Sequence, residues 1–182
     1  MACRAEFYAR AAEEIKRECS DLWILLETNG YGLTPRILEI LASGGVDSFW
    51  LDIKAYEDVH KRLCGTTNKW ILEAPKLIVD MGFVLEVLTL YIPGWVELDQ
   101  IAKIAELIAD VDKSIHFTIL AFFPEYKLRD VRPPNLYEMV AAYYVAKGKG
   151  LENVKLGNIH VFAKSSEDVK LLVSLLGARA LG

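Results

Sequence analysis

Cysteine is scarce in this sequence, and its three residues lie far apart. Cys3, Cys19 and Cys64 are separated by 16 and 45 positions, spacings that match no zinc, haem or CxxC pattern. A disulfide scaffold is excluded, because such scaffolds are short and rich in cysteine. We therefore expect the three thiols to be inert and to pack as small hydrophobic groups.

Long apolar runs and blocks of positive charge are missing as well. The longest apolar run, 139–146, has eight residues, whereas a membrane span needs about 20. Lys and Arg number 21 and Asp and Glu 25, which gives a net charge of −4. Nucleic acid and anionic membranes are therefore not expected as partners. The first residues include Arg4 and Glu6 and no apolar signal region, so we expect a cytoplasmic protein.

Several signatures of catalysis are also missing. His60, His116 and His160 lie on different predicted elements, and no HxH, HExxH or HxxxH pair occurs, so a histidine metal site has no support. The sequence contains no GxSxG, GxxxxGK[ST] or GxGxxG motif. Serine hydrolase, P-loop and dinucleotide-binding functions therefore lack the residues they need.

What is present is a regular alternation of short apolar runs and amphipathic stretches. The 182 residues, 53% of them hydrophobic, suit a single domain over 1–182 that folds without disulfides or a structural metal. Nearly apolar strands that alternate with helices predict a parallel sheet buried on both faces. Five strands are too few for a closed eight-stranded barrel, so we expect an α/β fold that forms part of a TIM-like barrel. The strands are predicted at 22–27, 47–54, 83–92, 115–123 and 153–159, and the helices at 5–19, 34–43, 57–63, 68–81, 97–111, 135–147 and 167–176.

Polar residues interrupt the apolar runs mainly where the strands end, which is where parallel α/β proteins bind ligands. Glu27 ends the first strand, and Asp52 and Lys54 lie on one face at the end of the second. The Asp52 and Lys54 pair could hold a zwitterionic ligand or form an internal ion pair. Glu27 with Asp52 would suit a hard cation. Glu86 is a carboxylate within a strand, facing either a polar lumen or a neighbouring cation.

Aromatic residues gather in the last third of the chain. Phe122, Phe123 and Tyr126 follow the fourth predicted strand, and Tyr143 and Tyr144 lie in the next helix. Because aromatic side chains contribute much of the buried area in proteins, we expect this group to belong to the core.

The motifs at the strand ends, taken in order, resemble a known family. ETNG (27–30), WLDIKAY (50–56), HKRLCGTTN (60–68) and LYIPGWVE (90–97) resemble radical S-adenosylmethionine (SAM) enzymes of the pyruvate formate-lyase activating type. FFPEYKL (122–128) and GLENVKLGNI (150–159) resemble the AmmeMemoRadiSam-like branch of that family. The resemblance covers nearly the whole chain.

The resemblance assigns roles to seven residues. It implies that Glu27, Thr28 and Asp52, with the backbone carbonyl of Trp50, help to bind a monovalent cation beside the methionyl carboxylate of SAM. It implies that Lys54 lies near that carboxylate. Ile92 and Gly94 would line the adenine.

The sequence also departs from the family. Glu27 stands where aspartate is common, and Leu88 stands where the third strand often carries arginine. The CxxxCxxC motif, whose thiolates bind a [4Fe–4S] cluster, and the GGE motif do not occur. The chain therefore looks like the C-terminal portion of a radical SAM domain, without its first two strand units. SAM and the cluster are implied for the full-length parent, and we expect neither to bind tightly to this chain alone.

Three functions are compatible with these residues. The first is a portion of a radical SAM activating-type oxidoreductase, inactive alone, whose parent cleaves SAM reductively to a 5′-deoxyadenosyl radical. The second is a non-catalytic binding or assembly module. In both cases the strand at 22–27 should be an exposed edge, covered by the missing N-terminal portion, by a second polypeptide or by self-association. The third is an unrelated barrel enzyme that uses Lys54 or the carboxylates, for example through a Schiff base.

Overall fold

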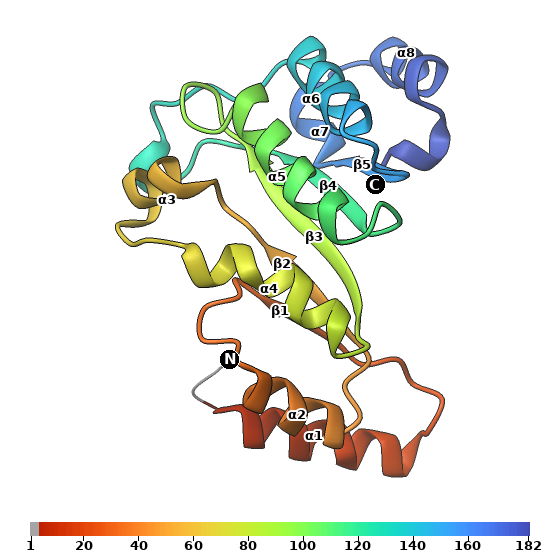
Figure 1. Cartoon of the computed structure of the whole chain (residues 1–182). Helices are drawn as coiled ribbons and strands as arrows, with labels where there is room; N and C mark the ends of the chain where they lie inside the picture. The colour runs from red at the N-terminus through yellow and green to blue at the C-terminus, as the bar shows by residue number, and fades with distance from the viewer. Residues whose placement is uncertain (1–3) are drawn as a thin grey trace.

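Five parallel strands form one open sheet in the computed structural model of the chain, which describes residues 4–182 (Figure 1). Their order in the sheet is their order in the sequence, β1-β2-β3-β4-β5, and every adjacent pair is parallel. The predicted parallel α/β sheet of about five strands is therefore confirmed, and the sheet is not closed into a barrel. The strands are β1 (Leu25–Thr28), β2 (Ser48–Asp52), β3 (Val84–Tyr91), β4 (His116–Ala121) and β5 (Asn153–Gly157).

Helices connect the strands, as parallel pairing requires. Local sequence signals fix several of their starts. Thr34 accepts a hydrogen bond from Ile37 N at the start of α2, where Pro35 occupies the first helical position. Asn135 and Ser165 begin α6 and α8 with capping boxes. The helices are α1 (Ala5–Glu18), α2 (Pro35–Ser43), α3 (Glu57–Cys64), α4 (Lys69–Asp80), α5 (Leu98–Val111), α6 (Leu136–Gly148), α7 (Ile159–Phe162) and α8 (Ser166–Leu176), with 3₁₀ turns at Tyr126–Leu128 and Ala178–Ala180.

The helices cover one face of the sheet and leave the other open, so the expectation that the strands are buried on both faces is wrong. Along β3, Leu85 and Val87 are buried on the helix side. Glu86 and Leu88, which point the other way, are only partly buried. Figure 1 shows α4 and α5 lying in front of the strands. The core is therefore a single layer between sheet and helices, and the opposite face is free for function.

Close packing joins the first helix pair to the sheet. A Cβ on Gly44 would lie 2.4 Å from the backbone oxygen of Ala9, so α1 and α2 can approach this closely only because residue 44 is glycine. Asp47, just before β2, accepts hydrogen bonds from Lys16 Nζ at 2.8 Å and Ile24 N at 2.7 Å. These bonds hold α1 and the segment before β1 against β2.

Some element boundaries differ from the predicted ones. β1 begins at Leu25 rather than at Leu22. One reason is that the N–H of Ile24 is taken by the Asp47 side chain instead of a neighbouring strand. β5 ends at Gly157, because Asn158 adopts a left-handed conformation (φ 55°) and starts α7. The expectation of an aromatic core group is wrong in part: Phe122 is buried, but Phe123, Tyr126 and Tyr144 are exposed.

The two edges of the sheet differ. β1 forms one edge, and no other strand within residues 4–182 pairs with its outer side. At the other edge, the end of the chain covers part of β5. Leu181 forms a parallel bridge with Leu156, and Gly182 N donates to Leu156 O at 2.9 Å.

None of the helices in this described part of the chain combines the length and the hydropathy that crossing a bilayer requires.

Candidate functional site

A polar cavity of about 510 Å³ lies at the carboxyl ends of β1 and β2. Strand register explains how it forms. Glu27 pairs with Trp50 across β1 and β2, so both side chains stand on the open face, and Asp52 lies one pleat further along that face. The structure thus brings together the four polar residues that the strand-end motifs selected. The cavity is lined by Glu27, Thr28, Asn29, Asp52 and Lys54.

The turn after β1 is shaped by its own side chains. Thr28 is buried, and its hydroxyl accepts a hydrogen bond from Gly30 N at 3.1 Å. Asn29 Oδ1 accepts from Tyr31 N at the same distance. Gly30 has a φ of +75°, and a Cβ there would lie 2.9 Å from Leu51 Cδ1. Residue 30 therefore needs glycine both for its backbone conformation and for space.

Asp52 and Lys54 form an ion pair inside this cavity. Both side chains are partly exposed, at 22% and 37%. The pair lies beside Glu27 rather than on the helix-covered face. Asp52 and Lys54 therefore form an ion pair with each other and also face the space in which a ligand would bind. An ammonium held by a carboxylate is not the free amine that Schiff-base formation needs, which disfavours a lysine-dependent aldolase.

His60 on α3 was not selected from the sequence as a functional residue. Its side chain is 3% exposed, and its Nδ1 has no hydrogen-bond partner. Burial lowers the pKa of His60, the nearby Asp52 carboxylate opposes this change, and the Lys54 ammonium adds to it. The imidazole therefore favours the neutral form next to the ion pair. The motif HKRLCGTTN contained this residue, but no sequence signal indicated that Nδ1 is unpaired.

Ile92 and Gly94 lie elsewhere on the rim. Ile92 is 2% exposed and belongs to the core. Gly94 has a φ of +76° in the turn after β3, and its N–H donates to Glu97 Oε1 at 2.9 Å. Neither residue lines the polar cavity. A Cβ on Gly94 would meet no atom within 4 Å, so the backbone here faces open space.

A larger cavity of about 620 Å³ covers the middle of the open face. Glu86 on β3 accepts a hydrogen bond from the Thr118 hydroxyl at 2.6 Å. Glu86 therefore faces a cavity of mixed polar and apolar lining, and no ion-pair partner lies beside it within residues 4–182. The lining residues are Glu27, Trp50, Glu86, Leu88, Thr118, Leu120, Lys155, Gly157, Asn158, Ile159, His160 and Gly182.

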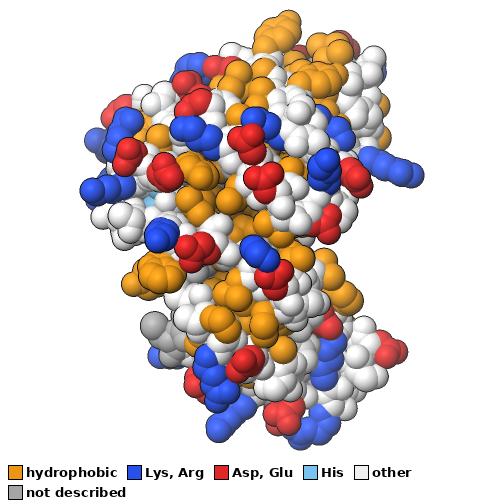
Figure 2. Space-filling view, in the orientation of Figure 1, with side chains coloured by type: hydrophobic (Ala, Val, Ile, Leu, Met, Phe, Trp, Pro, Cys, Tyr) orange, Lys and Arg blue, Asp and Glu red, His pale blue; other side chains and the backbone are white. Residues whose placement is uncertain are grey.

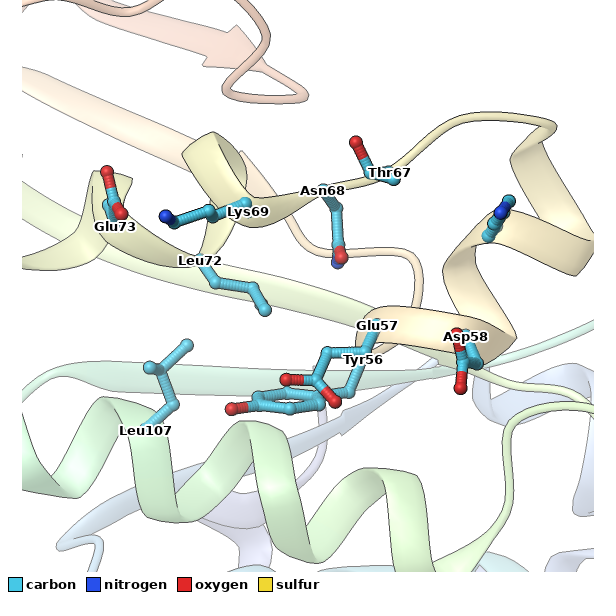
Figure 3. Close-up of a pocket in the computed structure, with 10 residues that line it drawn as sticks. Tyr56, Glu57, Asp58, Thr67, Asn68, Lys69, Leu72, Glu73 and Leu107 are labelled. Atoms are coloured by element: carbon cyan, nitrogen blue, oxygen red, sulfur yellow. The ribbon is translucent and has the colours of Figure 1, made fainter.

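A third cavity, of about 510 Å³, lies between α3, α4 and α5 (Figure 3). Figure 3 shows Tyr56, Asn68 and Leu72 pointing into it. Asn68 is buried and donates to Ala55 O at 2.8 Å, which ties the start of α4 to the end of β2. Figure 2 shows hydrophobic side chains gathering between α4 and α5, with charged groups of both signs around them. The sequence did not indicate this cavity.

The two cysteines that the structure describes do not pack as small hydrophobic groups, so that expectation is wrong for them. Cys19 and Cys64 are free and exposed, and Cys3 lies outside the described residues. Among residues 4–182, no group of three or more His, Cys, Asp and Glu side chains is placed to hold a metal ion. Desolvation raises the pKa of the Cys64 thiol, with Lys54 opposing and Asp52 adding to the effect. At neutral pH Cys64 is therefore a thiol and a weak ligand.

Comparison with protein families agrees with the motifs at this rim. The family model for the radical SAM superfamily matches residues 2–108, which is more than half of the chain. The chain belongs to the radical SAM superfamily. The resemblance to radical SAM enzymes inferred from the strand-end motifs is thereby confirmed.

Two proteins of the archaeon Methanocaldococcus jannaschii are similar in sequence. An uncharacterized protein is 32% identical over 149 residues, covering 80% of this chain and 43% of its own length. A second, assigned as a glycyl-radical enzyme activating enzyme, is 34% identical over 101 residues, covering 53% of this chain and 38% of its own length. This radical SAM chain thus spans about two fifths of the length of these curated relatives.

Solved structures show the same fold. A domain of pyruvate-formate lyase-activating enzyme from Bacteroides vulgatus superimposes with a TM-score of 0.67 at 14% identity, covering 85% of this chain and 94% of that one. A 2,3-dimethylmalate lyase gives a TM-score of 0.50 at 13% identity, covering 94% and 61%. At such identities the likeness concerns the fold alone.

Proposed function

We propose that this chain forms the SAM-binding rim of a radical SAM enzyme of the glycyl-radical-enzyme activating type. The observation that carries the proposal is the shared cavity of Glu27, Thr28, Asp52 and Lys54, residues taken from the ETNG and WLDIKAY motifs. When bound in such enzymes, SAM supplies a 5′-deoxyadenosyl radical upon reductive cleavage. The residues of this chain would bind and orient it.

The donor set fits the methionyl end of SAM. The Lys54 ammonium reaches into the cavity with part of its side chain exposed, and an ammonium is the natural partner of a carboxylate. The Asp52 carboxylate holds this ammonium in place. Glu27 has no ion-pair partner within residues 4–182, so it remains available to a positive group. A monovalent cation between Glu27, Asp52, the Thr28 hydroxyl and the Trp50 carbonyl is part of the proposal.

The adenine would lie toward the turn after β3. There the backbone of Gly94 faces open space, so a flat ring could approach it closely, while the buried Ile92 would support the turn from the core.

The [4Fe–4S] cluster does not fit this chain. The sequence holds no CxxxCxxC motif, and Cys19 and Cys64 lie on separate elements. Three thiolates must converge to hold such a cluster. We therefore assign the cluster to a polypeptide segment that would pair with β1, whose outer side is free within residues 4–182. Without that segment the chain should not cleave SAM.

The test is a titration of the intact chain with SAM, followed by ¹⁵N NMR, which detects weak binding. We expect saturable shifts of the Thr28, Gly30 and Lys54 amide signals. Asp52→Asn and Lys54→Met should each weaken binding about tenfold, because each removes a charge-assisted contact or the group that positions it.

The matched control is Lys76→Met. Lys76 pairs with Asp80 at 2.7 Å on the exposed surface of α4, so this variant loses an ion pair that does not line the cavity. It should bind SAM as the unmodified chain does. Shifts scattered over the surface, or equal binding by all three variants, would contradict the proposal.

A further inference from the structure

The open face of the sheet holds a cavity to which none of the sequence motifs assigns a role. It measures about 620 Å³, a size that suits a small organic molecule. It adjoins the polar cavity at the ends of β1 and β2, because Glu27 lines both. A ligand in it would therefore lie next to the proposed SAM site.

One end of this cavity is built to attract a cation. Glu27, Trp50 and Glu86 occupy one register row on three adjacent strands, so neighbouring residues are about 4.8 Å apart. The indole of Trp50 is 39% exposed and stands between two carboxylates. An aromatic face flanked by negative charge is a favourable site for an organic cation. Within residues 4–182 neither carboxylate has an ion-pair partner.

The other end of the cavity attracts an anion. Lys155 on β5 lies in register with Thr118, whose hydroxyl already donates to Glu86. Lys155 is partly buried, and its Nζ has no hydrogen-bond or ion-pair partner in the described chain. Asn158 and His160 line the same end. A partly buried ammonium without a countercharge is unfavourable unless a ligand supplies one.

The floor beside the two ends is mainly apolar. Leu88 follows Glu86 on the open face of β3, and Leu120 follows Thr118 on β4, while the Thr118 hydroxyl itself stands between Glu86 and Lys155. A Cβ on Gly157 would lie 2.4 Å from Leu120 Cδ2, so Leu120 extends over the bare backbone of β5. The backbones of Glu86 and Lys155 are two strands apart and offset by two residues along the strands, about 12 Å in all. The two charged ends therefore lie a short distance apart, with an apolar surface beside them.

We infer that this cavity binds a small dipolar molecule, with an organic ammonium group against Trp50, Glu27 and Glu86 and a carboxylate against Lys155. That this molecule is the substrate of the radical rests on the proposed function. The binding itself does not.

The test uses 6-aminohexanoate, which carries both charges on an apolar chain, with hexylamine and hexanoate as single-charge controls. Binding to the intact chain is followed by the ¹⁵N signal of the Trp50 indole, identified by its loss in Trp50→Phe. We expect 6-aminohexanoate to bind about tenfold more tightly than either control, because it makes both charged contacts. Glu86→Gln keeps an acceptor for Thr118 and should reduce binding toward that of hexanoate. Lys155→Met should reduce it to that of hexylamine.

The outcomes separate this inference from the proposed function. Equal binding of the three probes, or unchanged binding by both variants, overturns the dipolar site. Glu86→Gln and Lys155→Met should bind SAM as before, whereas Asp52→Asn should not. If SAM fails to bind while 6-aminohexanoate binds as expected, the proposed function is wrong and the dipolar site stands. Urea unfolding of each variant shows whether a loss of binding reflects a loss of folding.

Discussion

Replacing Gly30 by alanine tests whether the turn beneath the polar cavity is held by packing as well as by backbone conformation. Residue 30 has a φ of +75°, and the added Cβ would lie 2.9 Å from Leu51 Cδ1 and 3.4 Å from Ile71 Cγ2. The left-handed conformation costs alanine about 1–2 kcal/mol. Leu51 is fully buried, so the clash adds the cost of overpacking a core, about 1–3 kcal/mol.

The chain offers a matched control for the conformational part. Gly65 and Gly82 have φ values of +77° and +85°, and a Cβ on either would meet nothing within 4 Å. Gly65→Ala and Gly82→Ala should therefore lose only the conformational cost. Gly30→Ala should lose about 1–3 kcal/mol more, which lowers the urea midpoint by a further 0.5–1.5 M at an m value of about 2 kcal/mol/M. Circular dichroism during urea unfolding measures this, and equal losses in all three variants would refute the reasoning.

Three further predictions follow from the cysteines, the sheet edge and His60. Anaerobic reconstitution with iron and sulfide should leave the chain without a stoichiometric [4Fe–4S] cluster, because its thiols cannot converge; about four irons per chain would contradict this. The free edge at β1 should make the chain a dimer in size-exclusion chromatography, and Leu25→Lys should shift it toward monomer; a clean monomer at high concentration argues against the edge. Burial, opposed by Asp52 and assisted by Lys54, lowers the pKa of His60 from 6.5, so its contribution to stability is complete above about pH 6.5 and is lost as the pH falls through the lower folded pKa. Urea unfolding from pH 7 to 5 should show this loss, His60→Leu should reduce it, and His160→Gln, at an exposed histidine, should keep it.

Much of the fold could be predicted from the sequence, because local signals and long-range pattern agree. The alternation of apolar runs with amphipathic stretches predicts parallel β/α units, and the Thr34 and Pro35 start of α2 agrees with the predicted helix over 34–43. Which strand face the helices leave open could not be predicted. Leu88 and Leu120 are apolar residues on the open face. The sequence pattern of a strand with one uncovered face is therefore the same as that of a strand buried on both faces.

The candidate site was predicted more fully than its surroundings. Glu27, Asp52 and Lys54 come together because adjacent parallel strands end at one rim. The order of the motifs in the sequence is enough to predict this arrangement. Lys155 received no role, since its place opposite Thr118 depends on the register of β4 and β5. The orphaned Nδ1 of His60 depends on packing around α3, and the exposed Tyr126 depends on a left-handed turn (φ 48°).

The unequal edges of the sheet set a limit on how far it can grow. The end of the chain occupies part of the β5 edge through Leu181 and Gly182, so β1 offers the main unblocked row of backbone donors and acceptors. Two copies that met β1 to β1 about a two-fold axis would use up both free rows at once. Further copies would meet the β5 edge, which the end of the chain partly covers. Such a pairing would therefore end at two, and the partly covered β5 edge would disfavour growth into fibrils.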